Sequence, residues 1–334
     1  MDAERTPEDT AQEAGPLAVC LYGPTGVGKT ALALSLAAQL PVEIIGVDSA
    51  MVYRHMDVGT AKPGPRERAA VPHHLVDIRD PWEAYSAGEF RADALRLIPE
   101  ICGRGRLPLL VGGTMLYFRA LWRGLAPLPQ ADPATRREIA DTAGRQGWKA
   151  LHEELARIDP QAAGRINPSD RQRIGRALEV FRLTGRPIST LQAVAGRTTG
   201  VRFLRIALWP ADRAQLYRAL DERLHAMLQA GFLDEVRTLR GLALMSCDRP
   251  AMRAVGYRQL WQHLAGESDL AEAGRQAAVA TRRLAKRQLT WMRAESANLD
   301  LAVPADDAAA RIAGLLTRSG VSRQTLRCNM MDAP

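Results

Sequence analysis

Cysteine is scarce in this sequence of 334 residues. The four cysteines, Cys20, Cys102, Cys247 and Cys328, are scattered along the chain, and no Cys-x-x-Cys pair or Cys/His cluster occurs. The pattern therefore indicates neither a disulfide framework nor a zinc site. Free thiols are typical of proteins in a reducing compartment.

Long apolar runs are also lacking. No stretch approaches the roughly 20 apolar residues that a membrane-spanning helix needs. The first fifteen residues are polar and acidic, which is typical of a disordered tail and not of a signal peptide. We therefore expect a cytoplasmic protein that has no membrane partner.

Aromatic and acidic residues are both under-represented. Aromatic residues make up 5% of the chain, so we expect a core of Leu, Ala, Val and Ile. The 37 acidic residues are outnumbered by 45 Lys and Arg, which leaves a net charge of +8. This balance suggests an anionic partner such as nucleic acid, although many ordinary enzymes are also basic.

The most informative stretch that is present is GPTGVGKT at residues 23–30. It fits the phosphate-binding pattern G-x-x-x-x-G-K-[ST], and it lies between an apolar run at 17–22 and a helical pattern at 30–39. A strand, a glycine loop and a helix start aim backbone N–H groups and a positive dipole end at an anion. We expect a phosphate site with Lys29 as its point charge and the Thr30 hydroxyl as a Mg²⁺ ligand.

The apolar pattern continues as an α/β unit. It predicts further strands at 42–47, 75–78 and 107–111, and a strand at 201–209 that we expect to be the last of the sheet. It also predicts a helix at 86–104, whose Ser86 and Glu89 have capping-box spacing. Strands that alternate with helices imply a parallel sheet with ligands at its carboxyl edge. Lys29, Asp48 and Thr114 each follow a strand end, so we expect them to converge.

The alternation of strand and helix patterns stops at Pro127, Pro129 and Pro133, and helical patterns dominate from there to residue 196. We therefore predict a P-loop NTPase-like parallel sheet with flanking helices and an all-helical insertion. The predicted boundaries are a disordered tail at 1–15, a core at 16–128 and 197–320 with C-terminal helices, an insertion at 129–196, and a second disordered tail at 321–334.

Basic charge is concentrated in two of the helical regions. The insertion carries Arg165, Arg171, Arg173, Arg176, Arg182 and Arg186 with few acids nearby. Around 271–295, Arg275, Arg282, Lys286 and Arg293 share one helical face, and Ala277, Leu284 and Trp291 share another. Such a helix could lie along nucleic-acid phosphates, although a solvated face is the simpler interpretation of any single charge run.

The acid that nucleotide-hydrolysing motors place at a strand end is not evident. The best candidate strand, 107–111, ends in Gly112 and Gly113, and Asp48 follows the second strand instead. This arrangement favours group transfer. Asp48 is a candidate general base, with a helix cap or an indirect Mg²⁺ ligand as alternatives. We interpret His73 and His74 as structural, because adjacent side chains point different ways and no third metal ligand is obvious.

Together these stretches resemble the tRNA dimethylallyltransferase (tRNA isopentenyltransferase) family over about residues 17–300. The segments that carry the resemblance are GPTGVGKT (23–30), DSAMVYRHMDVGTAKP (48–63), PHHLVDIRDPWEAYSAGEF (72–90), LLVGGTMLYFRAL (109–121), INPSDRQRIGRALEV (166–180), MRAVGYRQLW (252–261) and TRRLAKRQLTWMR (281–293). The resemblance implies a prenyltransferase that moves a dimethylallyl group from dimethylallyl diphosphate to N6 of adenosine 37, beside the tRNA anticodon. Mg²⁺ is the implied cofactor, the tRNA anticodon stem-loop is the implied partner, and we expect a monomer.

The resemblance also implies which residues act. Catalysis would fall to Asp48, which takes the N6 proton, and to Thr114 beside the adenine. The donor's diphosphate, in place of ATP, would bind Gly23, Pro24, Thr25, Gly26, Val27, Gly28, Lys29, Thr30 and Arg223, with Mg²⁺ on Thr30. The tRNA would contact Asp48, Ser49, Ala50, Met51, Thr114, Arg136, Gln172, Arg173, Ile174, Gly175, Arg176, Arg253, Ala254, Val255, Gly256, Tyr257, Arg258, Lys286, Arg287, Gln288, Leu289, Thr290, Trp291, Met292 and Arg293.

Small departures and two alternatives remain. Gly26 stands where the family often has Ala, Met51 occupies a variable position, and the zinc finger of eukaryotic relatives is absent, which favours a bacterial type. A small-molecule kinase would explain the GKT motif but not the basic stripes or the helical insertion. A non-catalytic nucleic-acid binder with a relic P-loop would predict that Asp48→Ala leaves function intact.

Overall fold

The structure is a computed structural model that describes residues 15–193 and 199–319. The described chain forms two compact units, one of residues 15–119 and 200–319 and the other of residues 120–193 and 199. The predicted tails at 1–15 and 321–334 lie outside the described residues, except for residue 15. In the part that is described, no helix combines the length and apolar character needed to cross a lipid bilayer.

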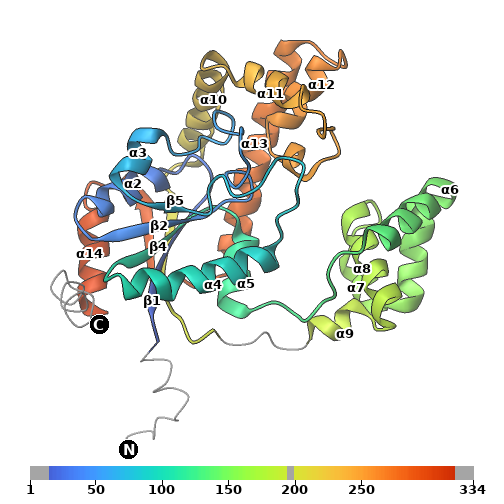
Figure 1. Ribbon diagram of the computed structural model, residues 1–334, viewed down its shortest axis with the longest axis horizontal. Helices are drawn as coiled ribbons and strands as arrows, with labels where there is room; N and C mark the ends of the chain where they lie inside the picture. The colour runs from blue at the N-terminus through green and yellow to red at the C-terminus, as the bar shows by residue number, and fades with distance from the viewer. Residues whose placement is uncertain (1–14, 194–198, 320–334) are drawn as a thin grey trace, which may run out of the picture. The chain divides into compact units, whose positions relative to one another are not determined.

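The first unit is built on a six-stranded parallel sheet of order β3-β2-β4-β1-β5-β6 (Figure 1). Its strands are β1 (Leu17–Tyr22), β2 (Val42–Val47), β3 (His73–His74), β4 (Leu107–Gly112), β5 (Arg202–Pro210) and β6 (Leu299–Val303). The central strands are apolar on both faces, as a sheet covered by helices requires. The predicted strands at 17–22, 42–47, 107–111 and 201–209 are confirmed within a residue at each end.

Helices cover the sheet on two sides. Val19 and Leu21 of β1 pack in one cluster with α2 (Lys29–Ala37) and α14 (Ala308–Arg318). At the next position after Leu21, Tyr22 packs on Phe118 of α5 (Met115–Arg123), with ring centroids 5.6 Å apart. The alternation of side chains along a strand therefore supplies both layers of the core.

The remaining helices of this unit follow their local signals. α4 (Ala87–Gly103) begins at Ser86, whose hydroxyl accepts from the Glu89 N–H at 3.1 Å, while the Glu89 carboxylate accepts from the Ser86 N–H at 2.8 Å. The predicted capping box is thus confirmed. The other helical elements are α3 (Pro65–Ala70), α10 (Arg213–Gln229), α11 (Phe232–Arg240), the 3₁₀ turn η1 (Pro250–Arg253), α12 (Tyr257–Leu264) and α13 (Leu270–Met292).

Two strand predictions were wrong. Residues 75–78 form no strand, because Leu75 and Asp77 adopt positive φ angles of 60° and 57°, and the Asp77 carboxylate binds Lys62 and Arg68. The strand lies instead at His73–His74, where it pairs with β2. The sheet also does not end at β5, since β6 pairs beyond it, from Ile206↔Leu299 to Pro210↔Val303.

The second unit is helical throughout its described residues. It contains α6 (Pro133–Ile158), α7 (Pro160–Arg165), α8 (Arg171–Thr184) and α9 (Ile188–Gln192), and α6 is kinked at Gly147, where φ is 82°. An apolar core holds these helices together, and it includes Ile139, Leu151, Leu155, Ile174 and Leu178. The unit begins nine residues before the boundary predicted at residue 129, because it takes in the end of α5.

A buried carboxylate organises the basic face of this second unit. Glu179 is fully buried and accepts from Arg136 Nε at 2.8 Å, from an Arg176 guanidinium nitrogen at 2.6 Å, and from the Asp132 N–H at 2.8 Å. These donors hold the pKa of Glu179 below its ordinary value although burial alone would raise it. Arg136 and Arg176 are therefore already engaged by an internal partner.

Candidate functional site

The site lies where the carboxyl ends of β1, β2 and β4 meet the start of α2 and the middle of α10. A cavity of about 510 Å³ opens there, and both its walls belong to the first unit. From the predicted site residues it gathers Thr25, Gly26, Gly28, Lys29, Thr30, Asp48, Met51, Arg223 and Gln288. Residues distant in the sequence therefore converge as the parallel topology predicts.

The glycine loop forms one wall. Gly28 has a φ of 92°, a left-handed conformation that only glycine adopts without strain, and it directly precedes α2. The residue at the N-cap, Gly28, has no side chain that could accept from the first N–H groups of the helix. These N–H groups are therefore left without a side-chain cap beside the cavity that Lys29 and Thr30 line. A helix start of this kind is suited to bind an anion.

Lys29 and Arg223 face this cavity together with Asp48, and the oppositely charged Lys62 and Glu67 also line it. The pKa of the Lys29 ammonium is lowered from 10.5 to about 8. Burial is the main cause, Asp48 opposes the shift, and nearby Arg223 adds to it. Burial also lowers the pKa of Arg223, again against the attraction of Asp48. Two cations that interact unfavourably without a ligand would be stabilised by a bound anion.

Lys29 is held by its own loop. Its Nζ donates to the Gly23 carbonyl at 3.0 Å and to the Pro24 carbonyl at 2.7 Å. An ammonium has three N–H donors, so one remains for a ligand in this arrangement.

Asp48 lies at the end of β2, beside the two cations. Its Oδ1 accepts the N–H groups of Ala50 at 2.8 Å and Met51 at 3.3 Å. The alternative of a helix cap was wrong, because these residues form a turn and the next helix, α3, begins only at Pro65. Among the described residues no donor is bonded to Oδ2. The two backbone bonds fix the orientation of the carboxylate and leave one oxygen free to accept a proton.

Thr114 ties the end of β4 to the end of β2. Its Oγ1 accepts from the Ser49 N–H at 3.1 Å, and its own N–H donates to the Val47 carbonyl at 3.2 Å. Thr114 therefore lies next to the segment that carries Asp48, although it does not line the cavity itself.

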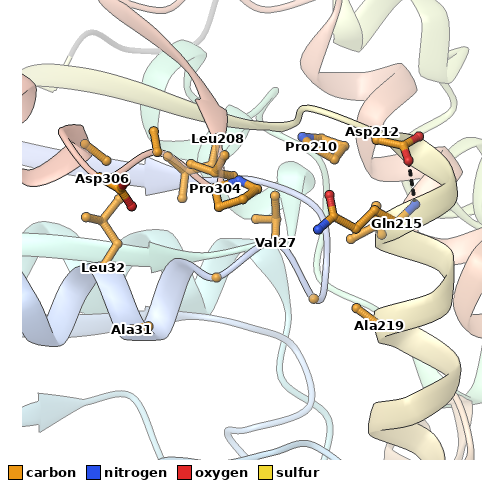
Figure 2. A pocket seen from close by; sticks show the side chains of 16 residues that line it. Val27, Ala31, Leu32, Leu208, Pro210, Asp212, Gln215, Ala219, Pro304 and Asp306 are labelled. Carbon is orange, nitrogen blue, oxygen red and sulfur yellow. Dashed lines mark hydrogen bonds between the residues drawn. The ribbon is translucent and has the colours of Figure 1, made fainter.

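A second cavity of about 410 Å³ also borders the glycine loop (Figure 2). It shares Gly26, Gly28, Ala31 and Ala219 with the first cavity. Its lining is mainly apolar, and its charged members, Asp212 and Asp306, are acidic. A diphosphate is therefore suited to the first cavity and not to this one.

The residues predicted to contact tRNA differ in exposure. Exposed positions in the described structure are Ser49, Arg136, Gln172, Arg173, Arg253, Arg258, Lys286, Arg287, Thr290 and Arg293. Partly buried positions are Asp48, Ala50, Met51, Thr114, Gly175, Arg176, Ala254, Val255, Gln288 and Trp291. The structure buries Ile174, Gly256, Tyr257, Leu289 and Met292, which pack inside their units.

The predicted register of α13 was partly wrong. Its buried stripe is Ala273, Ala277, Ala285, Leu289 and Met292, whereas Leu284 and Trp291 are only half-buried. Two of the four cations proposed for its basic face are paired, Arg275 with Glu272 at 2.7 Å and Arg282 with Asp221 at 2.7 Å.

Lys62 is a residue of the site that sequence reasoning missed. It lines the cavity with only 2% of its side chain exposed, and its Nζ donates to the Tyr53 carbonyl at 2.7 Å and binds Asp57 and Asp77 at 2.5 and 2.6 Å. Because two carboxylates neutralise this lysine, its role is to hold together the segments that form the wall of the cavity. Its place in the segment DSAMVYRHMDVGTAKP was the available signal.

The comparisons with known proteins identify similar chains. The model of the IPP transferase family matches residues 51–295, and that of the AAA family, ATPases associated with various cellular activities, matches residues 19–67. The chain is 56% identical over 286 residues to a tRNA dimethylallyltransferase of Stenotrophomonas maltophilia strain R551-3, which covers 84% of this chain and 90% of that protein.

Solved structures agree with this result. A full-length tRNA isopentenylpyrophosphate transferase of Bacillus halodurans is 37% identical with a TM-score of 0.65, over 94% of this chain and 99% of that one. A eukaryotic dimethylallyltransferase acting on tRNA has a TM-score of 0.72 at 24% identity, over 92% and 80% of the two chains, and it is similar in fold. The predicted P-loop NTPase-like fold is confirmed.

Proposed function

Because the chain belongs to the IPP transferase family, we propose that it transfers a dimethylallyl group from dimethylallyl diphosphate to N6 of adenosine 37 of tRNA. In this reaction a new C–N bond forms at N6, the C–O bond of the donor breaks, and diphosphate leaves with the electron pair. The N6 proton passes to a base. The observation that carries the proposal is the single cavity that joins the glycine loop, Arg223 and Asp48.

The glycine loop and the two cations are suited to the donor's diphosphate. Backbone N–H groups at the start of α2 can bind its oxygens, while Lys29 and Arg223 offset its charge. The negative charge on diphosphate grows as the C–O bond breaks, so these groups stabilise the transition state more than the ground state.

Asp48 is suited to accept the proton. Asp48 lines the same cavity as Lys29 and Arg223, and among the described residues no donor occupies its Oδ2. An exocyclic amine conjugated to a purine ring is a weak nucleophile until it loses a proton. Thr114, linked to Ser49, is the residue proposed to lie beside the adenine.

Mg²⁺ is part of this proposal. The described residues hold no group of three His, Cys, Asp or Glu side chains suited to a metal. Mg²⁺ commonly binds through substrate phosphates, water and one or two protein oxygens, so the Thr30 hydroxyl at the start of α2 fits that mode. The ion would offset phosphate charge during transfer.

The target adenine must leave its stack to reach a cavity of this kind. The exposed cations of α13, together with Arg253 and Arg258, support binding to the phosphates of an anticodon stem-loop.

The proposal is tested by incubating the protein with unmodified tRNA, Mg²⁺ and dimethylallyl diphosphate labelled in the dimethylallyl group. We expect label in the RNA and an equal amount of released diphosphate. A tRNA with guanosine at position 37 is the matched control, because it lacks the N6 amine. Equal labelling of both tRNAs, or of neither, would contradict the proposal.

A further inference from the structure

Gln288 lies on α13 but is directed into the cavity. Its neighbours Lys286 and Arg287 are exposed, whereas Gln288 is half-buried and lines the cavity with Lys29 and Asp48. The sequence grouped Gln288 with its basic neighbours as a contact for tRNA, and the structure gives it different partners.

The carboxamide of Gln288 bridges the two sides of the site. Its Oε1 accepts the N–H of Thr25, in the glycine loop, at 2.9 Å. Its Nε2 donates to the carbonyl of Gly113, just beyond β4, at 2.9 Å. One side chain therefore links the loop suited to the diphosphate with the residue that precedes Thr114.

The fit around this bridge is tight. A Cβ atom at Gly113 would lie 2.4 Å from Gln288 Nε2 and 3.1 Å from the Gly23 carbonyl oxygen. Gly113 is thus a glycine because the glycine loop and Gln288 both approach its backbone closely. The bridge needs an acceptor atom and a donor atom bonded to the same carbon, which a carboxamide supplies and a carboxylate does not.

We infer that Gln288 is a positioning residue: it fixes the spacing between the glycine loop and the Asp48–Thr114 edge, and it places that spacing under the control of α13. The inference rests on the proposed function. Transfer needs the donor carbon and the acceptor nitrogen at near-attack distance, and a misplacement of about 1 Å can cost roughly 100-fold in rate. A positioning residue on the helix with exposed Lys286 and Arg287 also links RNA binding to the donor loop.

The test is Gln288→Glu, which keeps the shape but sets an oxygen against the Gly113 carbonyl. Gln276→Glu is the matched control on the same helix, because Gln276 is exposed and its bond within the described part of the chain is to Glu272. We expect Gln288→Glu to lower the single-turnover transfer rate about 10- to 100-fold, with RNA affinity unchanged within about twofold. The control should retain the wild-type rate.

The pH dependence separates positioning from a general loss of structure. A protonated glutamic acid can donate to Gly113 and accept from Thr25, as glutamine does. The rate of Gln288→Glu relative to wild type should therefore recover as the pH falls from 8 to 5, toward the ordinary glutamic acid pKa of about 4.3. A rate equal to wild type, an equal loss of RNA affinity, or a deficit independent of pH would overturn the inference.

A measurement on the wild-type protein covers the case of a misfolded variant. The Thr25 amide should be protected from hydrogen exchange in the ligand-free protein, because it donates a hydrogen bond to Gln288 Oε1. An unprotected Thr25 amide would overturn the role of Gln288 alone, whereas absence of transfer by wild type would overturn the proposed function.

Discussion

Raising the pH from 7 to 9 should weaken the binding of dimethylallyl diphosphate, because Lys29 loses its proton in this range when the cavity is empty. Burial and the neighbouring Arg223 lower the pKa of Lys29 to about 8, against the opposing effect of Asp48. A diphosphate beside Lys29 favours the charged form and returns its pKa toward or above the ordinary value of 10.5. Binding above pH 8 therefore requires the uptake of a proton.

The size of the effect follows from linkage. At pH 7 about nine in ten Lys29 side chains are charged in the free protein, and at pH 9 about one in ten are, so affinity should fall about tenfold. The stability of the ligand-free protein changes with pH in the opposite direction to this affinity. Because the folded pKa lies below the unfolded value, the ligand-free protein should become more stable as the pH rises from about 8 toward 10.5.

Titration calorimetry with dimethylallyl diphosphate at several pH values, in buffers of different ionisation enthalpy, measures both affinity and proton uptake. Lys29→Arg is the matched variant, because a guanidinium keeps its charge throughout this range. The reasoning is refuted if wild type binds equally well at pH 7 and 9, or if Lys29→Arg loses affinity to the same extent.

Three further predictions concern other parts of the chain. Asp48→Ala should lower the transfer rate about 10²- to 10⁴-fold while tRNA still binds in a filter assay, and an unchanged rate would remove Asp48 as the base. Replacing Lys286 and Arg287 with Ala should reduce the slope of log affinity for tRNA against log salt by up to about two, whereas an unchanged slope would place the tRNA elsewhere. Glu179→Gln should lower the free energy of unfolding by about 2 kcal/mol in urea followed by circular dichroism, and a loss below about 0.5 kcal/mol would show that the buried carboxylate does not hold the second unit together.

The glycine loop and its flanking elements could be predicted because their signals are local. Strand Leu17–Tyr22, the loop at 23–30 and the start of α2 need only neighbouring residues to adopt their conformations. The convergence of Lys29 and Asp48 then followed from the rule that parallel strands end at one edge.

The errors arose where distant contacts decide the structure. Residues 75–78 are apolar enough for a strand, but Lys62 and Arg68 bind Asp77 and hold the backbone in a turn. The strand Leu299–Val303 is only five residues long, and its pairing with β5 begins where Asn298 exchanges hydrogen bonds with the backbone of Arg205. Neither partner is visible from local pattern.

Gln288 illustrates the same limit within the site. Its sequence neighbours are cations, so pattern alone assigns it to their surface. Its role depends on the packing of α13 against the glycine loop and the end of β4, and sequence spacing carries no information on that contact.

The most direct test of the account is mass spectrometry of tRNA digested after incubation with the protein, dimethylallyl diphosphate and Mg²⁺. The account predicts that the mass of one dimethylallyl group appears on the fragment that contains adenosine 37, and that Asp48→Ala abolishes most of this product. An unmodified fragment from tRNA that the protein binds, or the added mass at another nucleotide, would contradict it.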